Sequence, residues 1–128
     1  SHLKSHVDYG IFLPIQLSAA SVLGSKEDLV KSAVQHYSSR SRMLVQGLTR
    51  MGWQVNSPGA GASVWAAIPP KWVQRGAVAF AEELLRSCGV VLMPGNLFGA
   101  EHNSHVRFAL VAPEHAIQDV LGRLERFI

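Results

Sequence analysis

Arg107 is the residue of this sequence whose type and surroundings point most directly to chemistry. It carries a fixed positive charge inside the apolar run of residues 105–111. A guanidinium group has five N–H donors, stays protonated, and matches the two oxygens of a planar anion such as a carboxylate. Two interpretations are open from the residues alone. Arg107 is either a structural arginine paired with an acid in an edge strand, or a ligand-binding arginine.

The pattern around Arg107 predicts which way its side chain points. Residues 105–111 alternate with the two-residue period of a strand, so Val106, Phe108 and Leu110 share one face. Arg107 belongs to the opposite face. We expect the apolar face to pack against helices and Arg107 to lie on the uncovered face.

Other chemical motifs are weak or absent from the sequence. The 6 histidines show no metal-ligand spacing, because His102 and His105 lie in a predicted loop entering a strand, and no metal site is expected. Neither a glycine-rich phosphate loop nor a Gly-x-Ser-x-Gly motif occurs. The single cysteine, Cys88, excludes an internal disulfide and fits a cytoplasmic protein.

Composition and charge narrow the class of protein further. Hydrophobic residues make up 48% and charged residues 16%, which is typical of a folded globular chain. The net charge of +3 is mild and its basic residues are scattered, so nucleic-acid binding is not expected. No apolar run approaches the length of a membrane span, so no membrane partner is expected.

The elements that must position Arg107 follow from periodicity and from glycine and proline. The expected helices cover residues 11–23, 25–51, 77–88 and 113–128, and the expected strands cover residues 53–55, 62–68, 90–93 and 105–111. This order predicts an α+β, or α/β, two-layer fold with a small, mostly antiparallel sheet and helices on one face. The helix at 25–51 would be about 40 Å long, enough to link to another part of a larger protein.

Two helices have predicted core faces. In the helix at 77–88 the residues expected to be buried are Val78, Ala81, Leu84 and Leu85. In the last helix they are Ile117, Val120, Leu121, Leu124 and Ile128.

An ordered set of short motifs resembles the fold-type I, pyridoxal-phosphate-dependent aminotransferases, and most closely the branch of alanine and diaminopimelate aminotransferases. The motifs are Lys4-Ser5-His6-Val7-Asp8-Tyr9-Gly10-Ile11-Phe12, Pro14-Ile15-Gln16, Gly47-Leu48, Gly52-Trp53, Val64-Trp65-Ala66, Gly89-Val90-Val91, Pro94-Gly95, Phe98-Gly99 and residues 105–110. Together they span nearly the whole chain. No single motif carries the resemblance alone.

The resemblance implies a role for Arg107 and an arrangement of domains. In such enzymes the arginine at this position grips the α-carboxylate of the substrate, and Tyr9, Asn96 and Phe98 would lie at the edge of the pocket. Residues 1–24 would end the large cofactor domain, 25–52 would form the linking helix, and 53–128 the small C-terminal domain. The complete enzyme would use pyridoxal phosphate, act on an amino acid and a 2-oxo acid, and form a homodimer.

The chain also departs from the family pattern. The lysine that forms the Schiff base and the aspartate that pairs with the pyridinium nitrogen do not occur here, so no catalytic residue is assigned in this chain and no cofactor is expected to bind it alone. We therefore expect a C-terminal fragment of an aminotransferase that is inactive by itself. Two alternatives stay open: a stand-alone α+β ligand-binding or interaction module on this scaffold, and a pyridoxal-phosphate lyase of the same fold.

Overall fold

The computed structural model describes residues 10–25 and 30–128, and contacts divide the chain into two units, Ser1–Ala33 and Val34–Ile128. In the described part of the first unit, helix α2 (Leu13–Gly24) has Pro14 in its first turn, where a missing N–H costs nothing. None of its residues is buried, and Ile15 is 59% exposed. The domain boundaries expected at residues 24/25 and 52/53 stay a prediction. The expected pocket residue Tyr9 lies outside the described residues.

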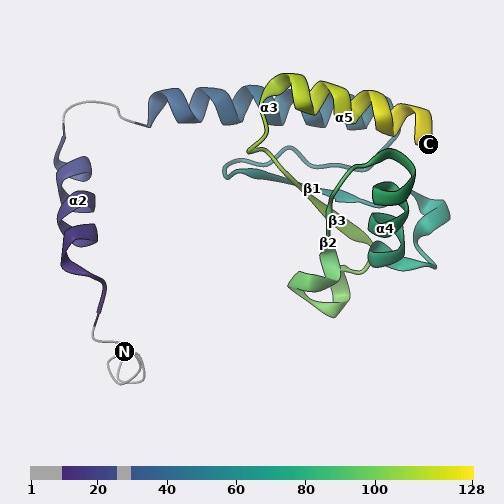
Figure 1. Cartoon of the computed structure of the whole chain (residues 1–128), viewed down its shortest axis with the longest axis horizontal. Coiled ribbons are helices and arrows are strands. Elements are labelled where there is room, and N and C mark those ends of the chain that lie inside the picture. Colours follow the sequence, from purple (N-terminus) through teal and green to yellow (C-terminus); the bar gives the residue numbers. More distant parts are fainter. Residues whose placement is uncertain (1–9, 26–29) are drawn as a thin grey trace. The chain divides into compact units, whose positions relative to one another are not determined.

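The second unit contains most of a long helix, a small sheet and two further helices (Figure 1). The elements are α3 (Lys31–Arg50), β1 (Ser63–Ala67), η1 (Pro70–Trp72), α4 (Gly76–Cys88), β2 (Met93–Pro94), η2 (Gly95–Phe98), η3 (Ala100–His102), β3 (His105–Ala109) and α5 (Glu114–Phe127). In residues 10–25 and 30–128, no helix has both the length and the apolar character that a membrane crossing requires.

The sheet has three antiparallel strands in the order β1-β3-β2, so the α+β fold with a small antiparallel sheet is confirmed. All four predicted strands are shorter than expected, and β1 and β3 lose only terminal residues. Val55 makes a single bridge to Ala66 and extends no further, since the turn-forming residues 56–59 follow it. Strand β2 covers only Met93 and Pro94, so residues 90–92 of the predicted strand do not join the sheet, and the strand ends at a proline, which has no N–H to donate.

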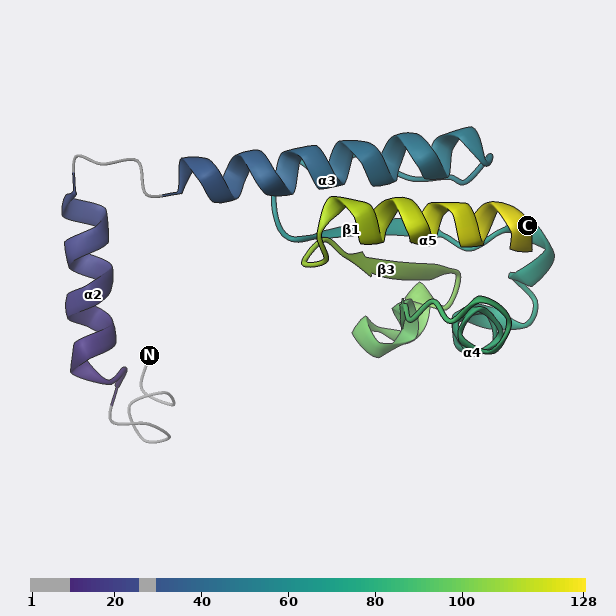
Figure 2. The same ribbon diagram turned by 45° about the horizontal axis from the view of Figure 1, so that its top comes forward.

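One hydrophobic core joins the sheet to α3, α4 and α5. The sheet contributes Val64, Ala66, Val106 and Phe108, which share one face. Helices α3 and α5 run side by side (Figure 2), and a β-carbon at Gly47 would overlap the side chain of Leu121. The absence of a side chain at residue 47 therefore sets how closely the two helices approach.

The buried face of α4 differs from the predicted one. Ala77, Phe80 and Leu84 are fully buried, whereas Val78 and Leu85 are 41% and 52% exposed. The predicted burial of those last two residues is wrong, because α4 has apolar residues on more than one side. Phe80 decides which side is buried, since its ring lies 5.6 Å from Trp53 and 5.5 Å from Trp72.

The core face of α5 is largely as predicted. Ile117 and Leu124 are buried, and Val120 and Leu121 pack against the core. Ile128 lies just past the last helical residue and is 43% exposed, so its predicted burial is wrong.

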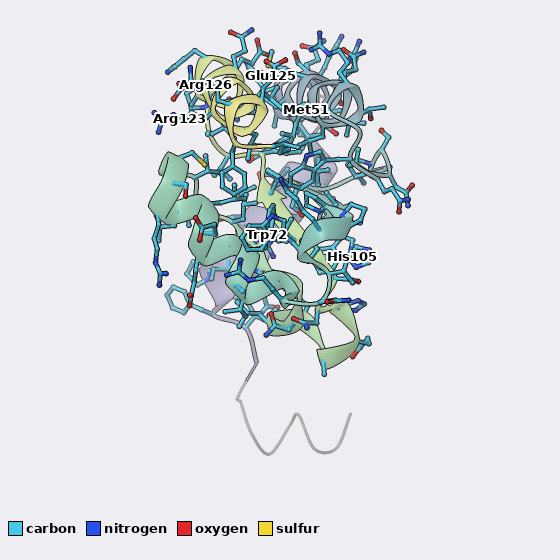
Figure 3. All side chains as sticks on the ribbon, turned by 90° about the vertical axis from the view of Figure 1, so that its right-hand side faces the viewer. Met51, Trp72, His105, Arg123, Glu125 and Arg126 are labelled. Atoms are coloured by element: carbon cyan, nitrogen blue, oxygen red, sulfur yellow. The ribbon has the colours of Figure 1, made fainter. Side chains whose placement is uncertain are left out.

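Arg123 joins α5 to the end of α4. Its Nη2 lies 2.7 Å from Oδ2 of Asp119, and its Nη1 donates a hydrogen bond of 3.1 Å to the carbonyl oxygen of Cys88. The hydrogen bond and charge of Asp119 raise the pKa of Arg123 further. Figure 3 shows Arg123 on α5 and Trp72 in the interior of the unit. A fixed cation thus meets the negative C-terminal end of α4, which stabilises both helices.

The adjacent leucines of α4 provide a direct test of the buried face. Leu84→Ala should lower the free energy of unfolding by about 2–5 kcal/mol, because it removes a fully buried side chain. Leu85→Ala should lower it by less than about 1 kcal/mol. Urea titration of the two variants checks this, and equal losses would contradict the assigned face.

Candidate functional site

Arg107 lies in the middle of the sheet. Strand β3 is the central strand, and Arg107 pairs with Trp65 of β1 on one side and with Met93 of β2 on the other. Val106 and Phe108 are 0% and 3% exposed, whereas Arg107 is half-buried. The predicted alternation is confirmed, and Arg107 lies on the face opposite the hydrophobic core.

Within the described part of the chain, no carboxylate forms an ion pair with Arg107. Its Nε atom is buried and has no hydrogen-bond partner. A structural arginine of a sheet is normally paired with an acid, because an unpaired charge is costly to desolvate. The geometry favours the interpretation that the guanidinium group binds a ligand.

An aromatic ring lies over the guanidinium group of Arg107. The Cζ atom is 5.0 Å from the ring centroid of Phe98, the last residue of η2. Asn96 belongs to the same short helix, and its Oδ1 atom is buried without a hydrogen-bond partner. Two of the predicted pocket residues, Asn96 and Phe98, therefore lie on one turn, η2, which contacts the strand of Arg107.

Three further residues surround this site that sequence reasoning did not select. The ring of Trp65 lies edge-on to Phe98 at 5.6 Å, stacks on His105 at 5.7 Å and meets His102 edge-on at 5.4 Å. We call Trp65, Phe98, His102 and His105 the aromatic cluster. The alternation of β1 could have shown that Trp65 points away from Val64 and Ala66, but the register with Arg107 is a tertiary feature.

Gly95 allows the η2 turn to lie against the start of β3. A β-carbon at this position would overlap the backbone carbonyl oxygens of His102 and His105. Backbone atoms cannot swing aside as a flexible side chain can. The position of Asn96 and Phe98 therefore depends on the lack of a side chain at residue 95.

Two lysines of the described part of the chain are the candidate amines for pyridoxal phosphate. The cofactor needs an amine for its Schiff base and an acid near its pyridine nitrogen. Of the two lysines in the described part, Lys31 begins α3 and Lys71 donates a hydrogen bond of 3.4 Å to the backbone of Ile128. Neither lysine belongs to the set of residues around Arg107, and the same part of the chain holds no group of three metal-binding side chains.

The chain matches the family "Aminotransferase class I and II" over residues 2–124 and belongs to it. This family implies pyridoxal phosphate as the cofactor of its complete enzymes.

Individual relatives agree with this assignment. The glutamate-pyruvate aminotransferase AlaC of Escherichia coli is 36% identical over 121 residues, which are 94% of this chain and 29% of AlaC. The LL-diaminopimelate aminotransferase of Gloeobacter violaceus is 32% identical over 96% of this chain and 31% of its own length. The substrate-bound structure of BacF from Bacillus subtilis has a TM-score of 0.81 at 25% identity, covering 98% of this chain and 32% of BacF. The chain thus spans less than a third of the length of these relatives.

The lack of an acidic partner predicts that Arg107 contributes little to folding. Arg107→Leu should change the free energy of unfolding of the 128-residue chain by less than about 1 kcal/mol, since it leaves no charge unpaired. A urea titration measures this change. A loss of about 3–5 kcal/mol, as expected on breaking a buried ion pair, would instead support the structural interpretation.

The close approach at Gly95 predicts a local change around Phe98. Gly95→Ala should displace the η2 turn, and with it the ring of Phe98, because the new methyl group meets two backbone carbonyls. Chemical shifts of the side chains of Trp65 and Phe98 should move while those of Leu124 stay constant. Gly122→Ala is the matched control, because a β-carbon at Gly122 meets open space.

Proposed function

We propose that this chain is the C-terminal part of a pyridoxal-phosphate-dependent aminotransferase and that Arg107 binds the α-carboxylate of its substrate. The complete enzyme moves an amino group between an amino acid and a 2-oxo acid. Membership of the aminotransferase family supports the reaction class. The single observation that carries the role of Arg107 is a central-strand guanidinium without an acidic partner in the described residues.

The charge and geometry of Arg107 suit both substrates of such a reaction. Amino acids and 2-oxo acids share a carboxylate next to the reacting carbon, so one bidentate site serves both halves of the cycle. Holding that carboxylate orients the reacting carbon relative to the cofactor, which lowers the entropic part of the barrier. Arg107 performs no proton transfer, because its guanidinium group stays charged.

The cofactor supplies the electron sink for the reaction when it is bound. We propose that its lysine and its other contacts come from parts of the complete enzyme outside this chain, since the described residues lack them. We further propose that the complete enzyme is a cytoplasmic homodimer. A single cysteine, Cys88, supports the compartment.

The test replaces Arg107 in the complete enzyme. Arg107→Leu should reduce kcat/KM for the amino acid about 100-fold, since a charge-assisted bidentate contact contributes about 3 kcal/mol. The absorption band of the bound cofactor should be retained. Stopped-flow measurement of the amino-transfer half-reaction gives both quantities.

Two controls show whether the loss reflects the carboxylate. Arg107→Lys keeps the charge without the planar fork and should recover only part of the activity. The amine that corresponds to the substrate without its carboxylate should react equally slowly with the parent enzyme and with Arg107→Leu. Unchanged kcat/KM in Arg107→Leu, or β-elimination in place of amino transfer, would refute the proposal.

A further inference from the structure

The orientation of the Arg107 guanidinium group needs an explanation, because the interaction that usually orients such a group is missing. Among the described residues no carboxylate pairs with it, and its buried Nε has no hydrogen-bond partner. The backbone of β3 fixes only the Cα atom, through its pairing with β1 and β2. A long side chain with several rotatable bonds then loses much conformational entropy if it is to hold one geometry for a substrate.

Phe98 provides the contact that orients this group. Its ring centroid lies 5.0 Å from the Cζ atom of Arg107, within the range of a cation–π interaction. A guanidinium group over the face of a ring is attracted by the ring quadrupole and by dispersion, and none of its N–H donors is used. A carboxylate partner would instead occupy the donors that the substrate requires.

Phe98 is itself held in place, although it is 44% exposed. Its ring makes a T-shaped contact with the ring of Trp65, at a centroid distance of 5.6 Å and an interplanar angle of 76°. Trp65 is fixed in turn by its stacking on His105 and its edge contact with His102. The aromatic cluster thus links strand β1, the η2 and η3 turns and the start of β3, and Phe98 is its member that contacts Arg107.

We propose that Phe98, supported by Trp65, is a positioning residue that orients Arg107 for the substrate carboxylate while leaving its terminal donors free. This inference rests on the proposed function of Arg107. It assigns to the aromatic cluster the orienting role that an acidic residue has at many arginine sites. Phe98 acts through Arg107 and takes no part in the chemistry.

The test measures KM and kcat separately in the complete enzyme. Phe98→Leu keeps an apolar side chain but removes the ring, so KM for the amino acid should rise about 3- to 30-fold, the range of a cation–π contact. The value of kcat should change less than KM does. Phe98→Tyr keeps the ring and should recover most of the lost affinity, which a general packing defect would not predict. Leu97→Ala is the matched control, because Leu97 lies in the same turn and is 65% exposed.

A double-mutant cycle decides whether Phe98 acts through Arg107. In the Arg107→Leu background, Phe98→Leu should have little further effect on KM. Equal effects of Phe98→Leu on KM in both backgrounds, or equal KM values for the Leu and Tyr variants, would overturn the proposal.

If Phe98→Leu does not fold, Trp65→Leu is the second variant, and its effect on KM should likewise depend on Arg107. Additive effects of Trp65→Leu and Arg107→Leu on KM would also overturn the proposal. If Arg107→Leu alone leaves kcat/KM unchanged, the proposed function fails and the positioning role fails with it. If Arg107→Leu raises KM and Phe98→Leu does not, only the positioning role fails.

Discussion

The burial of Val106 and Phe108 fixes the register of strand β3, and the site depends on that register. These side chains are at most 3% exposed and pack with α3, α4 and α5 in one core. Side chains of a strand alternate between faces, so a slip of one residue would bury the charge of Arg107 and expose Phe108. The free-energy cost of that exchange is far larger than the stabilisation that any contact of Arg107 provides. The hydrophobic core thereby places a guanidinium group on the opposite face of the sheet without using an ion pair to hold it there.

A cation in such a place must satisfy two opposing requirements. It must be ordered, because a substrate that binds to a disordered arginine loses affinity to the entropy of ordering it. It must also keep its donors unpaired, because every intramolecular hydrogen bond has to be broken before the ligand binds. Contact with an aromatic face meets both requirements, since it orders the group and uses no N–H donor. The distances among Arg107, Phe98 and Trp65 are consistent with this arrangement.

Much of the fold could be predicted from local pattern, but the site only in part. The strand of Arg107 and its two faces follow from a two-residue period, which is a property of the strand alone. The buried face of α4 was predicted correctly at Leu84 but wrongly at Val78 and Leu85, which are equally apolar. Only the packing of Phe80 against Trp53 and Trp72 selects between the faces. The aromatic cluster was missed for a similar reason. Trp65 and Arg107 are 42 positions apart, and strand register brings them together. The roles of Asn96 and Phe98 were inferred from family resemblance, and those roles stay predictions.

Helix α3 is connected to the strand of Arg107 by a second arginine. Arg40 of α3 donates hydrogen bonds of 3.0 Å and 3.3 Å to the carbonyl oxygens of Leu110 and Val111, just beyond the end of β3. These carbonyls have no partner in the sheet, because the ladder ends at Ala109. The bonds satisfy them and fix the end of β3 to a helix, while Leu110 continues into the core. The two arginines of this region therefore differ in physical role. Arg40 donates its hydrogen bonds to backbone carbonyls and holds β3 to α3. Arg107 keeps its terminal N–H donors available on the open face of the sheet.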